Sequence, residues 1–105
     1  MKIATSKTHR GFTIQKFTDR KNTQCSIQQS SDEATPAIWL GVDFANPKIM
    51  ASDAKRLGVV TDKTTGIINY PLPPQVDLTT RMHLTQDQVK AILPTLIKFV
   101  ETGEI

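Results

Sequence analysis

The stretch TRMHLTQDQVKAILPTLIKFVETG, residues 80–103, decides the fold class, because it joins a strand pattern to a helix pattern. Over residues 80–84 polar and apolar side chains alternate, which predicts a short strand. The alternation places Arg81 and His83 together on one face of this strand. A helix signal follows immediately, so the chain is expected to combine sheet and helix in one fold.

We predict that this helix covers residues 86–102. Thr85 and Gln88 match a capping box, in which the threonine oxygen accepts from the third helical amide and the glutamine reaches back. Gly103 is placed to end the helix, and Pro94 inside it predicts a kink. Apolar residues at three- and four-residue spacing form one stripe, which we expect to pack on one face of the sheet. The stripe consists of Val89, Ile92, Leu93, Leu96, Phe99 and Val100.

The rest of the chain supplies further strand patterns. Alternation over residues 11–19 and 24–29, on either side of a polar turn, predicts an N-terminal β-hairpin. The apolar run over residues 37–42 predicts a central strand covered on both faces. Residues 51–57 resemble a short helix that ends at Gly58. The predicted fold class is therefore α+β, with an antiparallel sheet of three to five strands and the C-terminal helix on one face.

Size and composition limit the choices further. With 105 residues, of which 38% are hydrophobic and 22% charged, the chain is expected to form a single domain over residues 1–105. The longest apolar runs fall far short of the roughly 20 residues that cross a bilayer. A secretory signal requires an apolar segment after its first positive charges, and no such segment follows the first lysines of this chain. We therefore expect a cytoplasmic protein with no membrane partner.

The positive charge is concentrated near the N-terminus. The net charge is +3, but residues 1–31 hold six lysines and arginines against one aspartate. Such asymmetry can mark a surface that faces a polyanion. Lysines at a sheet edge can equally serve to prevent aggregation, so both interpretations stay open. The candidate binding residues are Arg10, Lys16, Arg20 and Lys21 of the hairpin, together with the pair Arg81 and His83.

Catalytic and metal-binding patterns are weak. Cys25 is the only cysteine, and it could be combined with His83 and either Asp43 or Asp53, but no catalytic signature surrounds it. His9 and His83 lie far apart in sequence and in no metal-ligand spacing. The glycines stand singly, so no phosphate-binding loop is indicated. We predict a protein that is not an enzyme and that uses no metal and no cofactor.

Seven strings occur in order over nearly the whole chain: RGF-x4-F-x-D from Arg10 to Asp19, CSIQQSS, PAIWLGVD, ASDAKRLGV, TTG, RMHLTQDQV and ILPTLIKFVETGE. Together they resemble a set of short proteins encoded in tailed phages and prophages. The resemblance implies a context rather than a chemistry. Phage accessory proteins of this size are often inhibitors or adaptors of host machinery, including anti-CRISPR proteins, and would act in the host cytoplasm by occupying a surface.

Binding is thus expected ahead of catalysis. A protein partner is the first hypothesis, with an anti-defence inhibitor as its specific form. A weak nucleic-acid binder that uses the basic hairpin is the alternative, and it would bind phosphates in a salt-dependent way. Formation of a homo-oligomer is left open by the sequence.

Overall fold

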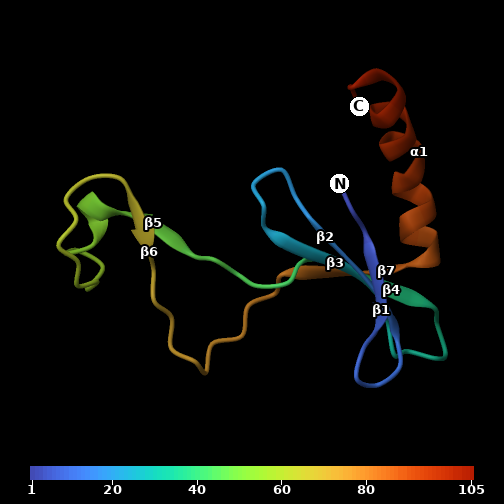
Figure 1. The fold of residues 1–105 in the computed structure, drawn as a ribbon, viewed down its shortest axis with the longest axis horizontal. Helices are drawn as coiled ribbons and strands as arrows, with labels where there is room; N and C mark the ends of the chain where they lie inside the picture. The colour runs from blue at the N-terminus through green and yellow to red at the C-terminus, as the bar shows by residue number, and fades with distance from the viewer. The chain divides into compact units, whose positions relative to one another are not determined.

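The computed structural model describes residues 1–105, which form two compact units (Figure 1). The first unit combines Met1–Asp43 with Thr80–Ile105, and the second is Phe44–Thr79. The second unit is therefore inserted between two segments of the first, within a chain that was predicted to form one domain. No helix has the length and apolar character needed to span a membrane.

A five-stranded sheet forms the centre of the first unit. Its strands lie in the order β1-β2-β3-β4-β7, and every neighbouring pair is antiparallel. A single C-terminal helix follows the last strand, so the predicted α+β class is confirmed. The strands are β1 (Ala4–Lys7), β2 (Thr13–Thr18), β3 (Gln24–Gln29), β4 (Ala37–Val42) and β7 (Arg81–Thr85).

The strands confirm the predicted hairpin and the strand over residues 37–42. β4 pairs on both sides, although β3 occupies the middle of the sheet, and the predicted cover on both faces is wrong because only Ala37 of β4 is buried. The strand predicted over residues 80–84 is present one residue further along, as Arg81–Thr85. β1 was not predicted, because Ala4–Lys7 is exposed throughout and has no apolar alternation. It adds to the sheet by backbone pairing with β2.

Strand register divides the sheet into two chemically different faces. Ser26, Gly41 and Arg81 are directly paired neighbours, so they share one face. We call this the polar face; its side chains include Lys16, Ser26, Gln28, Trp39, Arg81 and His83. The opposite side, the apolar face, carries Phe17, Cys25, Ile27, Ile38, Leu40, Val42, Met82 and Leu84.

Helix α1 (Gln86–Thr102) has the predicted bounds. Thr85 accepts a hydrogen bond from the Gln88 amide at 3.1 Å, and the Gln88 side chain accepts from the Thr85 amide at 2.9 Å. Gly103 ends the helix in the left-handed conformation, with φ of 76°. The helix continues through Pro94. Local capping chemistry therefore determines both ends of α1.

The packing of α1 differs from the prediction. No residue of the helix is buried, and its contact with the sheet is made mainly through β7. Leu96, in the middle of the apolar stripe, is 51% exposed. The physical reason is the connection, because Thr85 is both the last residue of β7 and the N-cap of α1. No loop residues are available to turn the helix back across its own sheet.

The second unit contains a two-stranded antiparallel sheet of β5 (Lys48–Met50) and β6 (Ile67–Asn69). The helix predicted over residues 51–57 is wrong in extent: only η1 (Ala51–Asp53) is a 3-10 helix, and turns follow it to Gly58. So short a segment gains too few backbone hydrogen bonds to propagate an α-helix. The small core of this unit is built by Ala51, Ala54 and Ile68, with Ile49 and Val59 packed against them.

Candidate binding surface

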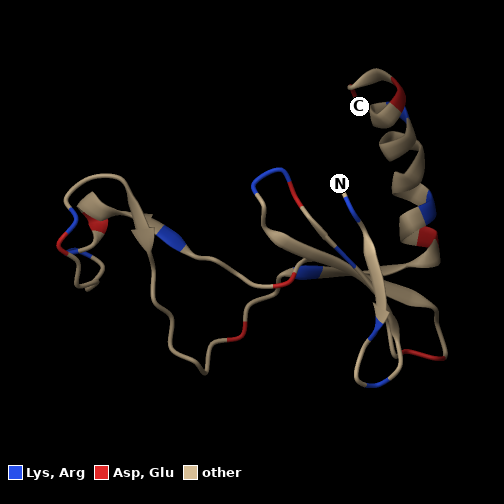
Figure 2. Cartoon of the chain, in the orientation of Figure 1, with Lys and Arg blue, Asp and Glu red and all other residues tan.

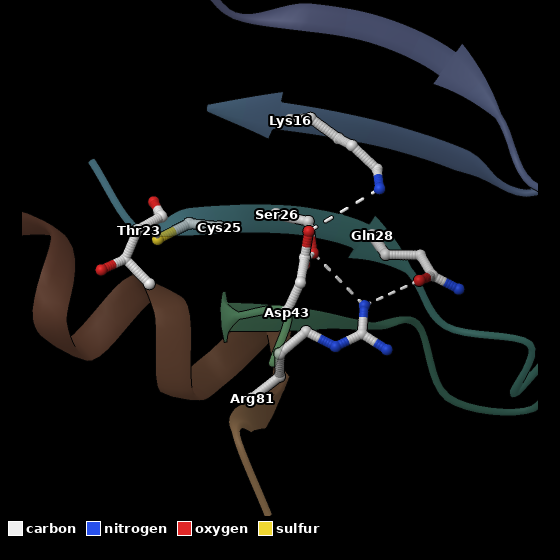
Figure 3. A network of polar contacts seen from close by, with 7 residues as sticks. All are labelled: Lys16, Thr23, Cys25, Ser26, Gln28, Asp43 and Arg81. Carbon is white, nitrogen blue, oxygen red and sulfur yellow. Dashed lines mark hydrogen bonds and ion pairs between the residues drawn. The ribbon is translucent and has the colours of Figure 1, made fainter. Parts of the chain in front are cut away.

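Arg81 is the central cation of the polar face (Figure 3). Its Nη1 donates to Gln28 Oε1 at 2.7 Å and lies 3.4 Å from Ser26 Oγ. The guanidinium carbon is 5.7 Å from the centroid of the Trp39 ring, within the range of a cation–π contact. These contacts draw the side chain back over β3 and β4 and hold it against the sheet.

Gly41 makes room for this arrangement. It pairs directly with Arg81, and a Cβ atom placed on it would lie 2.5 Å from the Thr80 carbonyl oxygen. The same Cβ would lie 2.9 Å from the Arg81 Cα. Only glycine allows so close an approach of the two backbones, so Gly41 helps to place Arg81 on the face.

A second group of polar contacts lies beside Arg81. The Ser26 hydroxyl, which is fully buried, donates to Asp43 Oδ1 at 2.5 Å. Lys16 Nζ lies 3.7 Å from Asp43 Oδ2, which is buried and accepts no hydrogen bond. The Lys16 side chain is 55% exposed whereas that of Asp43 is 11% exposed. Asp43 therefore serves as an internal anchor, and the solvent-facing charge is that of Lys16.

Trp39 and His83 form an aromatic pair on the same face. Their ring centroids are 3.9 Å apart and the ring planes differ by 7°, so the rings are stacked. The pairing of β4 with β7 sets the two residues directly opposite each other. His83 Nε2 also lies 2.9 Å from the hydroxyl of the buried Ser30. His83 is exposed and Trp39 is half-buried, so the pair presents a partly accessible aromatic edge beside Arg81.

Arg81 forms no ion pair of its own within the chain, and the Ser26 hydroxyl stands between its Nη1 and the Asp43 carboxylate. The two ion pairs are Lys16 with Asp43 and Arg56 with Asp53. Gln28 and Ser26 contact Arg81 through neutral oxygens. A guanidinium carries five N–H donors in a fixed plane, and those not used by Gln28 and Ser26 remain available for an acidic group.

The other predicted cations do not gather around Arg81. Arg10 lies in the turn between β1 and β2, whereas Arg20 and Lys21 lie in the turn between β2 and β3. The basic segments of the first hairpin are thus divided between its two ends (Figure 2). A strand of six residues such as β2 spans roughly 20 Å. Of the hairpin cations, Lys16 alone joins the network that contains Arg81.

Asp19 shapes the turn that carries Arg20 and Lys21. Its Oδ1 accepts from the Thr23 amide at 2.9 Å and from the Lys21 amide at 2.8 Å. Asn22 in the same turn has a left-handed φ of 67°. The backbone N–H of Thr23 holds the pKa of Asp19 below its usual range. Desolvation raises this pKa, but by less, and Lys21 lowers it further. The ionised form of Asp19 therefore stabilises this turn.

Cys25 lies on the apolar face, away from His83. It is 5% exposed, and its Sγ is 3.5 Å from the Thr23 carbonyl oxygen. Burial raises the pKa of the Cys25 thiol, with a smaller contribution from the carboxylates of Asp19 and Asp43. Because register places Cys25 and His83 on opposite faces, they do not form a nucleophile–base pair. No cluster of three or more His, Cys, Asp or Glu side chains suited to a metal is present.

The sequence patterns did not identify several contributors to this surface, among them Ser30, which contacts His83. Trp39 was interpreted as part of a strand covered on both faces, and Ser26 and Gln28 were taken only as the polar half of a strand pattern. The alternation of Ser26 and Gln28 with Cys25 and Ile27 was a usable signal for a polar row. Which strand would lie beside that row could not be derived from local patterns.

Comparison with protein-family models, with curated proteins and with solved structures gives no match.

Proposed function

We propose that this protein is a non-catalytic binding module whose polar face recognises an acidic group on a protein partner. The observation that carries the proposal is Arg81, a cation without an ion-pair partner that is held beside the stacked rings of Trp39 and His83. Arginine and tryptophan are enriched among the residues that contribute most of the free energy of protein–protein binding.

The contacts of Arg81 support tight recognition. Gln28 and Ser26 restrict the guanidinium before any partner arrives, which reduces the conformational entropy that binding would otherwise remove. A carboxylate could accept two parallel hydrogen bonds from the free N–H groups. Trp39 and His83 supply adjacent aromatic surface, and Lys16, although paired with Asp43, adds a second and more exposed cationic side chain.

The resemblance to proteins of tailed phages and prophages supports a narrower form of the proposal. The partner would then be a host protein, and the module would inhibit it by covering a functional surface. An anti-defence inhibitor, of which anti-CRISPR proteins are one type, fits this form. This form rests on the resemblance, whereas the polar face supports the broader proposal.

Nucleic-acid binding is the second candidate, and the aromatic pair is the observation that favours it. Proteins that bind single strands combine cations with rings on which bases stack. His83 and Trp39 with Arg81 and Lys16 offer both on one face. The separation of Arg10 from Arg20 and Lys21 gives less support, because a single strand would have to follow the whole hairpin to reach them.

Affinity capture with two matched variants tests the first candidate. Arg81→Gln removes the unpaired cation, and Arg56→Gln removes an exposed arginine from the second unit. We expect a protein captured from host lysate by the wild type to be lost with Arg81→Gln and kept with Arg56→Gln. Capture that both variants retain would contradict recognition through the polar face. Circular dichroism of each variant checks that it is folded.

Fluorescence anisotropy with labelled single- and double-stranded DNA and RNA tests the second candidate. Binding through phosphates must weaken steeply between about 50 and 200 mM salt. Stacking on the Trp39–His83 pair would also make His83→Ala weaken single-strand binding. An absent signal, or one that salt leaves unchanged, would exclude this candidate.

A further inference from the structure

The apolar side of α1 is exposed along its length. We call it the helix stripe and define it by the side chains of Ile92, Leu93, Leu96, Ile97, Phe99 and Val100. Their exposed fractions range from 41% for Ile92 to 84% for Val100. Most helices in proteins are stabilised mainly by burying such a stripe rather than by their helix propensity. The helix stripe therefore requires a covering surface.

The sheet of the same chain does not provide that cover. A groove of about 460 Å³ separates the start of α1 from the sheet, and its lining includes Ile38, Leu84, Val89 and Leu93. The α1 residues in this lining all belong to the first half of the helix. Figure 1 shows α1 extending away from the strands beyond that point. No residue of α1 is buried, so the strands of the same chain leave the second half of the helix uncovered.

The apolar face of the sheet is also insufficiently covered. Met82 is 54% exposed, and the larger side chains of this face, such as Leu40 and Leu84, are only half-buried. Ile14, the only large apolar side chain that is buried in the first unit, pairs with Gln28 and therefore lies on the polar face, not on this one. A domain of this size needs a continuous apolar core to be stable. Both parts of a helix-on-sheet core are present in this chain, but they are not packed against each other.

We propose that a second copy of this chain completes the core. In the resulting two-fold dimer, the helix stripe of each protomer packs on the apolar face of the other. Each chain supplies one exposed helix stripe and one exposed sheet face. A reciprocal two-fold arrangement therefore covers all four surfaces and leaves no open end to which a third copy could add. A different partner would have to supply both complementary surfaces, whereas a second copy carries them already.

The exposed area is of the size that a stable dimer needs. If each side chain of the helix stripe exposes about half of the roughly 150–200 Å² of a large residue, the stripe offers on the order of 500 Å². The apolar face adds to this, and the total approaches the roughly 800 Å² per partner of standard interfaces. At 100° per residue Lys98 lies opposite the helix stripe, whereas Lys90 and Glu101 border it beside Ile97, so no charged residue lies within the stripe itself. The polar face stays free for the proposed partner.

Light scattering after size-exclusion chromatography tests the dimer. We expect the wild type to have twice the 11.7 kDa mass of the chain. Leu96→Glu places a charge in the helix stripe and should reduce the mass to that of one chain. Ala91→Glu introduces the same charge on the other side of α1 and should leave the dimer intact. The proposal is overturned if the wild type has the mass of one chain at every concentration. It is also overturned if the Leu96→Glu variant still has the mass of two chains.

Hydrogen exchange of the wild type keeps the proposal testable if Leu96→Glu does not fold. Amides of the second half of α1 should become more protected as the chain concentration is raised through the dissociation constant, while those of β5 and β6 should not change. The dimer is contradicted if the protection of α1 does not depend on concentration and the mass is that of one chain. The helix stripe would then have to be covered by a different partner.

Discussion

Gly41 and Arg81 face each other across β4 and β7, and a Cβ atom on Gly41 would lie 2.9 Å from the Arg81 Cα. The hydrogen bonds of Arg81 to β3 depend on this close approach, because β7 must lie flat against β4 for the guanidinium to reach Gln28. The lack of a side chain at Gly41 on β4 thus allows the Arg81 side chain on β7 to take its position.

Gly41→Ala is expected to lower the free energy of unfolding by about 2 kcal/mol or more, because the new methyl group meets backbone atoms that cannot rotate away. Gly11→Ala is the matched control. Gly11 has a φ of 87° and no atom within 4 Å of an added Cβ, so only the conformational cost of about 1 kcal/mol applies. Urea unfolding measures both values. Equal losses for the two variants would show that the close approach is not important.

Asp43→Ala is expected to destabilise the protein more than Lys16→Ala. Removal of the carboxylate leaves the fully buried Ser26 hydroxyl without its acceptor, which costs about 1–3 kcal/mol. The lysine is largely exposed and 3.7 Å from its partner, so its loss should cost below about 1 kcal/mol. Thermal or urea unfolding of the two variants decides the order. The reverse order would contradict the anchoring role of Asp43.

Asp19 should make the stability of the second turn depend on pH. Its folded pKa is lowered, so its stabilising contribution is complete above the ordinary value of about 3.9 and is lost as pH falls through the folded value. The unfolding midpoint of the wild type should therefore be higher than that of Asp19→Ala at pH 7. The difference between the two midpoints should shrink below pH ~4. A difference that stays constant down to pH 2 would mean that ionisation of Asp19 does not matter.

Thr85→Ala is expected to cost about 1 kcal/mol, because it removes the side chain that accepts from the Gln88 amide. The change should reduce the helical signal in circular dichroism, since Thr85 caps the only α-helix. Gln86→Ala lies next to the cap and takes no part in it, so it should have little effect. Similar losses for both variants would argue that capping does not determine where α1 begins.

The parts of the fold that follow from local chemistry were predictable. Thr85 with Gln88 and the position of Gly103 specify both ends of α1, and the apolar run over residues 37–42 gives the bounds of β4. The packing of α1 was not predictable from its stripe, because an amphipathic pattern shows that a face needs cover but not which chain covers it. Ala4–Lys7 forms a strand only because β2 offers its edge.

The candidate site was predictable only in part. Alternation correctly put Arg81 and His83 on one face of a strand. Their partners Gln28, Ser30 and Trp39 lie in β3, directly after it and in β4, more than forty residues earlier in the chain, so their proximity depends on sheet order. The net charge of residues 1–31 suggested one basic surface, but the hairpin places its cations at both ends.

Site-specific photo-crosslinking tests recognition through the polar face most directly. The photoreactive residue p-benzoylphenylalanine would replace His83, beside Arg81, in one sample and Thr64, in an exposed loop of the second unit, in another. After irradiation in cells that contain the partner, we expect a discrete covalent protein adduct from position 83 and none from position 64. No adduct from position 83, or the same adducts from both positions, would contradict it.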